Sequence, residues 1–433
     1  MKYYCIGIKG AGMATLACIL FDLGHEVVGY DDYKDYKYTE DGLNKRKIKI
    51  YTNNSYILEK DTIVTYSAAF SGEHPEIKRV NNSPAKIMLY HDILGSLSAQ
   101  FKTICVAGTH GKTTTSMMLK TLLEKKVGCN YFIGDGTGYA NKKNELFILE
   151  SCEYKRHFLA YSPTITILTN IDLEHTECYK DIDDLINTFT TFINKTKDIV
   201  IACGDDQNIR KIKTNKEIIF YGFNEDNDVI AKNIKYSEHG SQFDCYINGI
   251  LFGNFILPLY GSHMILNALS AIYIGYLNNL TVTDIHNELD HFTNAKRRFK
   301  ENIIGDIVTI DDYAHHPTEI KVTLLSVKQK YPNKELVAVF MPNTYSRTKD
   351  FTEDFIESLN IADKAYVTPI NSDREIASDY DNISSDAIIN KLRNGTLITN
   401  ETVNQLLEHK NAVICFMSCA SIYILKDKYE ALL

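Results

Sequence analysis

The sequence predicts an α/β protein of three domains, each built around a sheet of mainly parallel strands. Segments with the alternating pattern of strands are separated by segments with the period of helices along most of the chain, the order expected when helices connect parallel strands. The succession of strand, turn and helix begins three times, at the N-terminus, near residues 98–103 and near residue 300. A length of 433 residues suits about two to four domains. We therefore expect domains at residues 1–98, 99–299 and 300–433.

The first segment has the order of a nucleotide-binding βαβ unit. A strand over residues 2–8 leads into a turn with three glycines, a helix follows over 13–25, and a second strand at 26–32 contains Asp31 near its end. This order is typical of a Rossmann-like domain, in which the helix N-terminus binds a diphosphate. The glycine turn alone fits an NAD-dependent oxidoreductase equally well. Its Gly-x-x-Gly-x-Gly spacing differs from the usual dinucleotide spacing, however, and no dehydrogenase catalytic set follows.

The second segment contains a shortened phosphate-binding loop. A strand leads into the loop GTHGKTT at residues 108–114. The helix that follows has its apolar residues on one face. The usual loop has four residues between its glycines, whereas only Thr109 and His110 separate the glycines here. In such a loop the backbone amides and the helix N-terminus bind phosphate, Lys112 neutralises phosphate charge, and Thr113 offers its hydroxyl to Mg²⁺. The sequence thus predicts a central P-loop ATPase domain, with a β-rich stretch at 218–260 and a helix at 264–277.

Acidic residues follow two strands beside this loop, where the carboxyl ends of parallel strands gather at one sheet edge. Glu150 and Glu153 follow one strand, and Asp172, Glu174 and His175 follow the next. Because Mg²⁺ prefers oxygen ligands and needs more than one of them, these residues are candidate metal ligands together with Thr113. Each acid considered alone is equally well explained as a solvated loop residue.

The third segment repeats the alternation of strands and helices. A strand at 306–314 leads into a helix that begins near Pro317, a position that suits a helix start. Strands at 335–342, 364–370 and 411–417 follow, with a helix between the first two. This pattern predicts a C-terminal Rossmann-like domain, and the alternation implies parallel pairing in all the sheets.

Composition excludes several classes of function. The formal net charge is −8 and no long basic segment is present, which argues against a nucleic-acid surface. The ten cysteines form no Cys-x-x-Cys pair, as expected of reduced thiols in a reducing compartment. The N-terminus lacks the pattern of a signal peptide, and no apolar segment approaches the roughly 20 residues of a membrane span. We expect a cytoplasmic protein.

With these motifs identified, the chain resembles the Mur ligases, ATP-dependent enzymes that add amino acids to the peptidoglycan precursor. The resemblance runs from end to end and includes a short phosphate loop that is the family's own form. It rests on GIKGAGM at 7–13, GTHGKTT at 108–114, ESCEYKRHF at 150–158, TNIDLEH at 169–175, HMILNALSAI at 263–272, KRRF at 296–299, DDYAHHPTEI at 311–320 and TYSRT at 344–348.

The resemblance implies a ligase that joins L-alanine to the muramoyl carboxylate of UDP-N-acetylmuramate through an acyl phosphate, with ATP and Mg²⁺ as cofactors, and a monomer or weak homodimer. Three domains that close on one another would bring the substrates together, the third carrying the amino acid. The catalytic residues expected are Lys112, Glu150, His175 and Arg298. The expected ATP-binding residues are Gly108, Thr109, His110, Gly111, Lys112, Thr113, Thr114 and Asn267. The expected UDP-sugar residues are Gly10, Ala11, Gly12, Met13 and Asp31. The expected metal ligands are Thr113, Glu150 and His175. The residues expected on the amino-acid side are Tyr313, His315, His316, Arg347 and Arg374.

Four features depart from the family pattern. The final strand is followed by Ser418, Cys419, Ala420 and Ser421 in place of a Gly-Ala-Gly-Asp turn, and Asn343, Asn294 and Met264 replace a histidine, a glycine and a polar residue. Two further functions therefore stay open. One is a related ligase that attaches a recycled peptide to the same UDP-sugar, and the other is a non-catalytic nucleotide-binding homologue, which the altered turn suggests.

Overall fold

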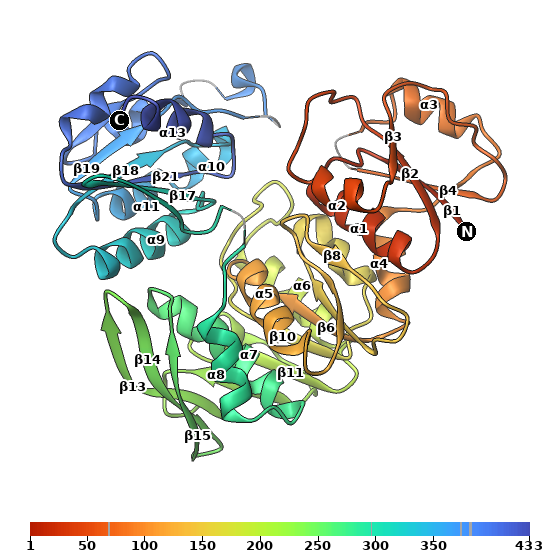
Figure 1. Ribbon diagram of the computed structural model, residues 1–433, viewed down its shortest axis with the longest axis horizontal. Coiled ribbons are helices and arrows are strands. Elements are labelled where there is room, and N and C mark those ends of the chain that lie inside the picture. Colours follow the sequence, from red (N-terminus) through yellow and green to blue (C-terminus); the bar gives the residue numbers. More distant parts are fainter. Residues whose placement is uncertain (68–69, 296, 373–374, 381–382) are drawn as a thin grey trace. The chain divides into compact units, whose positions relative to one another are not determined.

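The computed structural model describes residues 1–67, 70–295, 297–372, 375–380 and 383–433 (Figure 1). It contains three sheets, of five, ten and six strands, whose pairing is mostly parallel, so the predicted fold class is confirmed. By its internal contacts the chain divides into two compact units. The first comprises Met1–Lys232, Cys245–Gly253 and Leu266–Phe292, and the second comprises Asn233–Asp244, Asn254–Ile265 and Thr293–Leu433.

The N-terminal sheet has the strand order β3-β2-β1-β4-β5, and all its pairs are parallel. The aromatic and aliphatic side chains of β1, β2 and β4 form one cluster with residues of α3, which explains the apolar strand patterns of the sequence. The strands are β1 Lys2–Ile6, β2 Glu26–Tyr30, β3 Lys49–Tyr51, β4 Thr62–Tyr66 and β5 Lys86–Ile87. The helices are α1 Ala11–Asp22, α2 Glu40–Lys45, α3 Pro75–Asn81 and α4 Tyr90–Ser98.

The middle sheet has the order β15-β14-β13-β12-β11-β10-β6-β9-β7-β8. Its strand β6 lies between β9 and β10 and is parallel to both, which gathers the carboxyl ends of these strands at one edge. The strands are β6 Lys102–Ala107, β7 Cys129–Phe132, β8 Gly138–Tyr139, β9 Leu146–Glu150, β10 Ile165–Leu168, β11 Ile199–Cys203, β12 Ile218–Gly222, β13 Val229–Ser237, β14 Gly240–Ile247 and β15 Ile250–Leu257. The helices are α5 Lys112–Leu123, α6 Ile182–Ile193, α7 Ser262–Leu277 and α8 Val282–Asp290.

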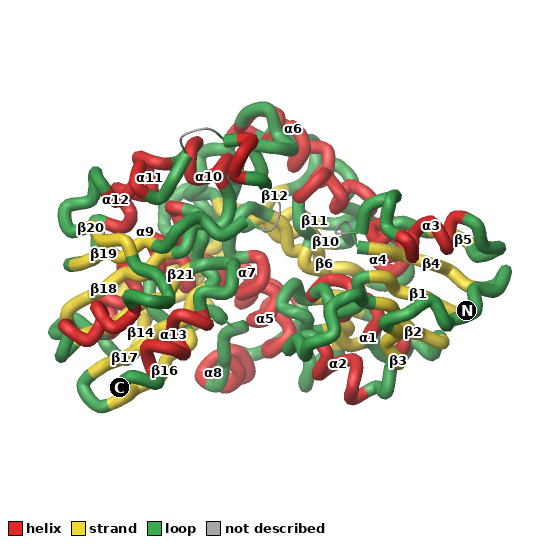
Figure 2. The backbone as a smooth tube through the Cα atoms, turned by 90° about the horizontal axis from the view of Figure 1, so that it is seen from above, coloured by secondary structure: helices red, strands yellow, loops and turns green. Residues whose placement is uncertain are grey.

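The C-terminal sheet has the order β16-β17-β21-β18-β19-β20. Figure 2 shows β18, β19 and β20 lying side by side in this sheet. The strands are β16 Lys300–Ile304, β17 Ile307–Asp312, β18 Glu335–Phe340, β19 Lys364–Val367, β20 Gly395–Leu397 and β21 Ala412–Met417. The helices are α9 Pro317–Lys330, α10 Tyr345–Asp350, α11 Thr352–Leu359, α12 Asp386–Ile389 and α13 Tyr423–Glu430.

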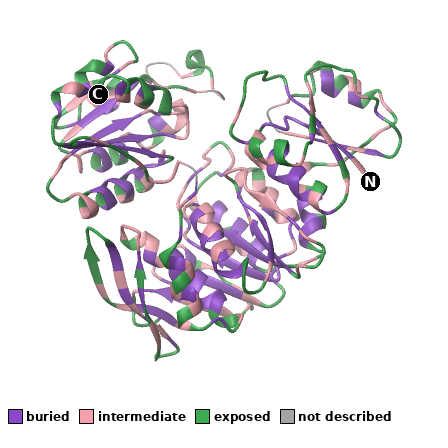
Figure 3. Cartoon of the chain, in the orientation of Figure 1, coloured by how far each residue is buried: buried purple, intermediate pink, exposed green. Residues whose placement is uncertain are grey.

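The central strands of this sheet are covered on both faces. Leu336, Ala338 and Phe340 of β18 pack in one cluster with α9 and α11, whereas Val337 and Val339 pack in another with α13. Strands buried on both faces have continuous apolar sequences, which is why ELVAVF and AVICFM lack polar alternation. Figure 3 shows these strands as buried.

The expectation of parallel pairing in all the sheets is wrong, because some strand pairs are antiparallel. Strand β8 is antiparallel to β7, and β16 is antiparallel to β17. Only Gly305 and Asp306 separate β16 from β17, and a two-residue connection allows only antiparallel neighbours. Gly305 has φ +58°, a left-handed conformation that suits such a turn.

All ten cysteines are free thiols, six of them in strands of the three sheets. Within the described ranges, no helix has both the length and the apolar character that crossing a membrane requires.

Candidate functional site

The phosphate loop connects the carboxyl end of β6 to the N-terminus of α5. Gly108 and Gly111 have φ +125° and +81°, conformations that side-chain-bearing residues rarely adopt. A Cβ on Gly108 would lie 2.1 Å from Oγ1 of Thr169, and one on Gly111 would lie 2.7 Å from Oδ1 of Asn267. Both glycines are therefore required by backbone conformation and by close neighbours. Asn267, one of the predicted ATP-binding residues, lies on α7 against this loop.

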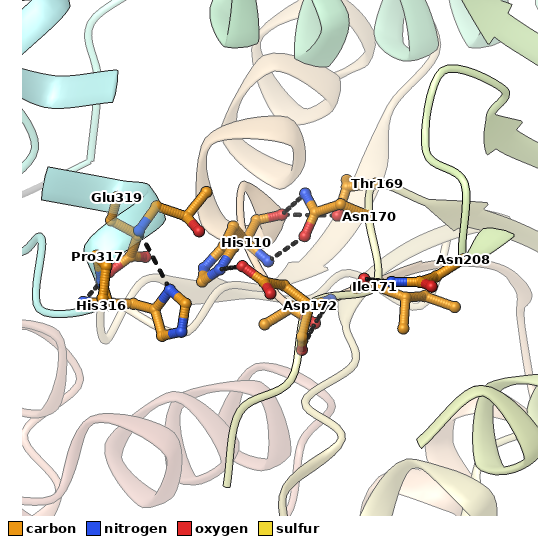
Figure 4. A network of polar contacts seen from close by, with 12 residues as sticks. His110, Thr169, Asn170, Ile171, Asp172, Asn208, His316, Pro317 and Glu319 are labelled. Atoms are coloured by element: carbon orange, nitrogen blue, oxygen red, sulfur yellow. Dashed lines mark hydrogen bonds and ion pairs between the residues drawn. The ribbon is translucent and has the colours of Figure 1, made fainter. Parts of the chain in front are cut away.

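The two residues between the glycines, Thr109 and His110, are held by the segment that follows β10. The amide of Thr109 donates to the carbonyl of Asn170, and the amide of His110 donates to Oδ1 of Asn170 at 2.8 Å. The carbonyl of His110 accepts hydrogen bonds from Oγ1 of Thr169 and Nδ2 of Asn170. The Nε2 atom of the His110 ring lies 3.2 Å from a carboxylate oxygen of Asp172. Figure 4 shows these side chains directed toward one another. The residues of the short loop are thus positioned by the segment Thr169–Asp172.

These contacts distinguish the amides of the loop. Those of Thr109 and His110 donate within the protein, so the phosphate contacts predicted for them would require a change of partner. The first helical hydrogen bond of α5 runs from the amide of Thr115 to the carbonyl of Gly111. The amides from Gly111 to Thr114 therefore precede the helical ladder at the positive end of the helix dipole, the arrangement that binds phosphate.

The ammonium group of Lys112 lies inside the loop. Its Nζ donates to the carbonyls of Gly108 and Thr109 at 2.5 and 2.7 Å, and to Oε2 of Glu153 at 2.9 Å. The side chains of Lys112 and Glu153 are only 12% and 1% exposed, so this is a buried ion pair. Burial, the largest single effect, would lower the pKa of Lys112, but the charges of Glu153, Cys152 and Glu174 and the hydrogen bond to Glu153 together outweigh it and raise the pKa, which keeps the lysine charged.

Glu150, at the end of β9, contacts the next residue of α5. Its Oε1 accepts a hydrogen bond from the hydroxyl of Thr113 at 2.9 Å, and its Oε2 accepts one from the amide of Gly134 at 2.8 Å. Burial raises the pKa of Glu150, although these two hydrogen bonds and the charge of Lys112 oppose the shift. Two of the predicted metal ligands are therefore in direct contact.

The third predicted ligand, His175, lies in a different cluster. Ligand atoms of His175, Glu153 and Glu174 lie within 4.8 Å of one another, a group able to hold a metal ion. Oε1 of Glu153 is buried, and no hydrogen bond reaches it from any described residue. A buried carboxylate oxygen that accepts no hydrogen bond within the described part of the chain, with the Nε2 atom of His175 at 3.8 Å, forms a group that fits a divalent cation. His175 has φ +55°, and its ring packs against that of Tyr154 at 4.9 Å.

The N-terminal glycine turn positions the start of α1. Gly10 is the N-cap of this helix, and Ala11, Gly12 and Met13 form its first turn, so their amides point out of the helix end. Asp31, which is only 7% exposed, accepts hydrogen bonds from the amides of Lys9 and Tyr33. Of the predicted UDP-sugar residues, Asp31 thus holds the turn, while the helix start offers the amides.

In the second unit, four of the predicted site residues lie around the start of α9, which carries Glu319 in its first turn. The guanidinium of Arg298 lies 5.1 Å from the ring centre of Tyr313 and 3.7 Å from the carboxylate of Glu319. Nδ1 of His315 lies 3.0 Å from Glu319, whereas His316, which is 3% exposed, caps α9 by accepting from the amide of Thr318 (Figure 4). The two histidines therefore have different positions, one beside the charged groups and one at the helix cap.

The departures from the family motif have local partners. Oδ1 of Asn343 accepts a hydrogen bond from Arg347 at 2.7 Å and so helps to position that arginine. The altered turn is held by Arg297, which donates to the carbonyl of Ser418 at 2.8 Å and pairs with Asp311. Arg374, which we predicted on the amino-acid side, lies outside the described residues.

Comparison with known proteins gives three matches to family models that together span most of the chain. The "Mur ligase family, catalytic domain" matches residues 2–102, the "Mur ligase middle domain" matches 106–275, and the "Mur ligase, glutamate ligase domain" matches 297–418. The chain belongs to the Mur ligase family. It is thus a member of a family of ATP-dependent amide ligases of peptidoglycan synthesis that use substrates of the UDP-N-acetylmuramate type.

Solved structures share the Mur ligase fold along all or most of the chain. UDP-N-acetylmuramate-alanine ligase MurC from Thermotoga maritima is 22% identical, with a TM-score of 0.81 over 100% of this chain and 99% of that one. Murein peptide ligase from Psychrobacter arcticus 273-4 is 20% identical, with a TM-score of 0.71 over 100% and 98%. MurF ligase from Thermotoga maritima in complex with ADP is 19% identical, with a TM-score of 0.66 over 88% and 96%. At these identities the likeness establishes the fold.

The sequence did not indicate the contacts that two residues make in this Mur ligase site. Glu153, one of the candidate metal ligands, belongs to the cluster with His175 and also forms an ion pair with Lys112 that the sequence did not indicate. Its position three residues after Glu150 was the available signal in the sequence. Asn170 gave no signal, because its two hydrogen bonds to His110 depend on the pairing of β6 with β10.

Proposed function

We propose that this Mur ligase joins L-alanine to the muramoyl carboxylate of UDP-N-acetylmuramate, with cleavage of ATP to ADP and phosphate. The observation that carries the proposal is the charged Lys112, buried at the start of α5 against two loop carbonyls and Glu153. A buried cation beside helix amides suits the terminal phosphates of a nucleotide. The choice of L-alanine rests on the motifs of the sequence, among them the DDYAHHPTEI segment around α9.

The proposed chemistry has two steps. A carboxylate oxygen of the sugar attacks the γ-phosphorus of ATP, and the bond to ADP breaks, which yields an acyl phosphate. The amine of alanine then attacks the acyl carbon, loses a proton and expels inorganic phosphate as the amide forms. Lys112 and Arg298 supply positive charge in this scheme, and each offsets the negative charge of the reacting groups. Holding the reactants in line contributes roughly 7–11 kcal/mol in favourable cases.

The remaining predicted residues take roles within this proposal. The amides at the start of α1 bind the diphosphate of the UDP-sugar, and Tyr313 and His315 contact the amino acid. Glu153, Glu174 and His175 are the residues that would hold Mg²⁺, since their ligand atoms already lie together. Bound Mg²⁺ would neutralise phosphate charge and orient the polyphosphate. Thr113 and Glu150, which contact each other, would extend this set.

The proposal includes the organisation of the protein. We assign UDP-sugar binding to residues 1–98, ATP binding to 99–299 and amino-acid binding to 300–433. The protein acts in the cytoplasm, where nucleotide-linked sugars and ATP are available, as a monomer or weak homodimer without nucleic acid.

A phosphate-release assay tests the proposal. The protein is incubated with ATP, Mg²⁺ and UDP-N-acetylmuramate, and either L-alanine or the tripeptide of recycled peptidoglycan is added. Alanine-dependent release supports the proposal. Release only with the tripeptide would identify the related peptide ligase instead, and ATP binding without any release would identify a non-catalytic homologue.

A further inference from the structure

Tyr90 is fixed at the start of α4 by two parts of the first unit. Helix α4 packs closely on the segment Tyr154–Ala160. The closeness is shown at Gly95, where an added Cβ would lie only 2.4 Å from the carbonyl oxygen of Ala160. The ring of Tyr90 also packs edge-on against Phe132 of β7, with the ring centres 6.3 Å apart. The direction of the tyrosine hydroxyl is therefore set by the packing of its ring.

This hydroxyl lies directly against the glycine turn of α1. A Cβ on Gly12 would lie 2.6 Å from Oη of Tyr90 and 3.3 Å from Cζ. Gly12 belongs to the first turn of α1, whose amides point out of the helix end. Tyr90 thus adds a side-chain hydroxyl to a group of backbone donors, and the absence of a side chain at Gly12 makes this approach possible.

The same hydroxyl is close to the residues around the phosphate loop. Phe132, which contacts the tyrosine ring, lies two residues before Gly134, whose amide binds Glu150. Burial raises the pKa of Tyr90 well above 10, and the nearby groups Tyr161, Cys152 and Glu150 raise it further. The phenol therefore stays protonated at neutral pH and acts as a neutral hydrogen-bond donor.

We propose that the hydroxyl of Tyr90 donates a hydrogen bond to an anionic oxygen of the UDP-sugar bound at the start of α1. This inference rests on the proposed function, and it adds to the site a residue that no motif of the sequence indicated. The diphosphate and the lactyl carboxylate of the sugar are the two anionic groups of such a ligand. A hydrogen bond from a fixed neutral phenol to either group holds the ligand in one position beside the helix amides.

The test uses Tyr90→Phe, which removes only the hydroxyl and keeps the ring packing. Dissociation constants of the full chain for UDP, UDP-N-acetylmuramate and ATP are measured by calorimetry. We expect binding of UDP-N-acetylmuramate to weaken roughly 10- to 100-fold, as for loss of a hydrogen bond to a charged group, while ATP binding is unchanged. Tyr161→Phe is the matched control, because Tyr161 is a buried tyrosine of the same neighbourhood that is not in contact with Gly12.

The outcomes separate this inference from the proposed function. Weaker binding of both UDP and UDP-N-acetylmuramate supports a contact with the diphosphate, and weaker binding of UDP-N-acetylmuramate alone supports a contact with the carboxylate. Equal binding of both ligands by Tyr90→Phe and the wild type would overturn the inference and leave the proposed function intact. A wild type that binds neither UDP nor UDP-N-acetylmuramate would overturn both. Unfolding midpoints of the two variants show that the fold is retained.

Discussion

Replacing Lys112 by methionine is expected to affect stability and activity by separable mechanisms. The substitution leaves the carboxylate of Glu153, which is 1% exposed, without its cation, and removes hydrogen bonds to two loop carbonyls. Removing one partner of a buried ion pair costs about 3–5 kcal/mol, and we expect a loss of unfolding free energy in that range. ATP-dependent phosphate release should fall roughly 10²- to 10³-fold, as when one charged contact to a reacting group is lost.

The double variant Lys112→Met/Glu153→Gln distinguishes the two effects. The second substitution removes the unpaired buried charge, so we expect the free energy of unfolding to return to within about 1–2 kcal/mol of the wild type, while phosphate release stays low. Urea unfolding followed by circular dichroism gives the stability, and calorimetry gives ATP affinity. If the single variant is no less stable than the double variant, the reasoning about a buried ion pair is refuted. If Lys112→Met still releases phosphate at the wild-type rate, the assigned phosphate site is wrong.

Three further results are expected. Gly108→Ala should lose about 1–3 kcal/mol of unfolding free energy in a urea titration and should bind ATP more weakly. The reason is that Gly108 has φ +125° and that a Cβ there would lie 2.1 Å from the side chain of Thr169. Gly72→Ala is the control and should leave the stability unchanged, because its Cβ would meet nothing within 4 Å. Burial raises the pKa of Glu150 above its ordinary 4.5, so the folded state holds this proton more tightly than the unfolded state does. The free energy of unfolding should therefore decline as pH rises from 4.5 through the folded-state pKa, and Glu150→Gln should flatten that decline in urea titrations across this range. Arg297→Met should lower the free energy of unfolding by about 3 kcal/mol, again measured by urea titration, because it leaves Asp311, whose side chain is only 8% exposed, without a cation. If the variant is as stable as the wild type, Arg297 does not hold the altered turn.

The sequence predicted the sheets better than it predicted their edges. The apolar segments ELVAVF and AVICFM are strands as expected, because burial on both faces leaves a clear apolar signal. Strand β16 was not predicted, because its residues are mostly exposed and carry no apolar pattern. Its antiparallel pairing depends on the two-residue turn at Gly305, which strand and helix periods do not report.

For the candidate site, motifs identified residue types but not their partners. Gly108 and Lys112 were predicted from local spacing alone; Gly108 lies in the loop between β6 and α5, and Lys112 is the first residue of α5. The partners Glu153 and Asn170 come from other strand ends, so their roles follow from the order of β9, β6 and β10 in the sheet. A single sequence without contacts between distant segments could not distinguish Glu150 from Glu153 as the residue that pairs with Lys112.

The strand order of the C-terminal sheet has a consequence for biosynthesis. Strand β21 pairs with both β17 and β18, although it is the last of these strands in the chain. While the ribosome is still producing the residues before Ala412, β17 and β18 lack a common neighbour and expose unpaired backbone groups. The C-terminal sheet is therefore completed only after about a hundred further residues have been synthesised beyond β17. During this interval the nascent chain can bind chaperones or form incorrect strand pairs.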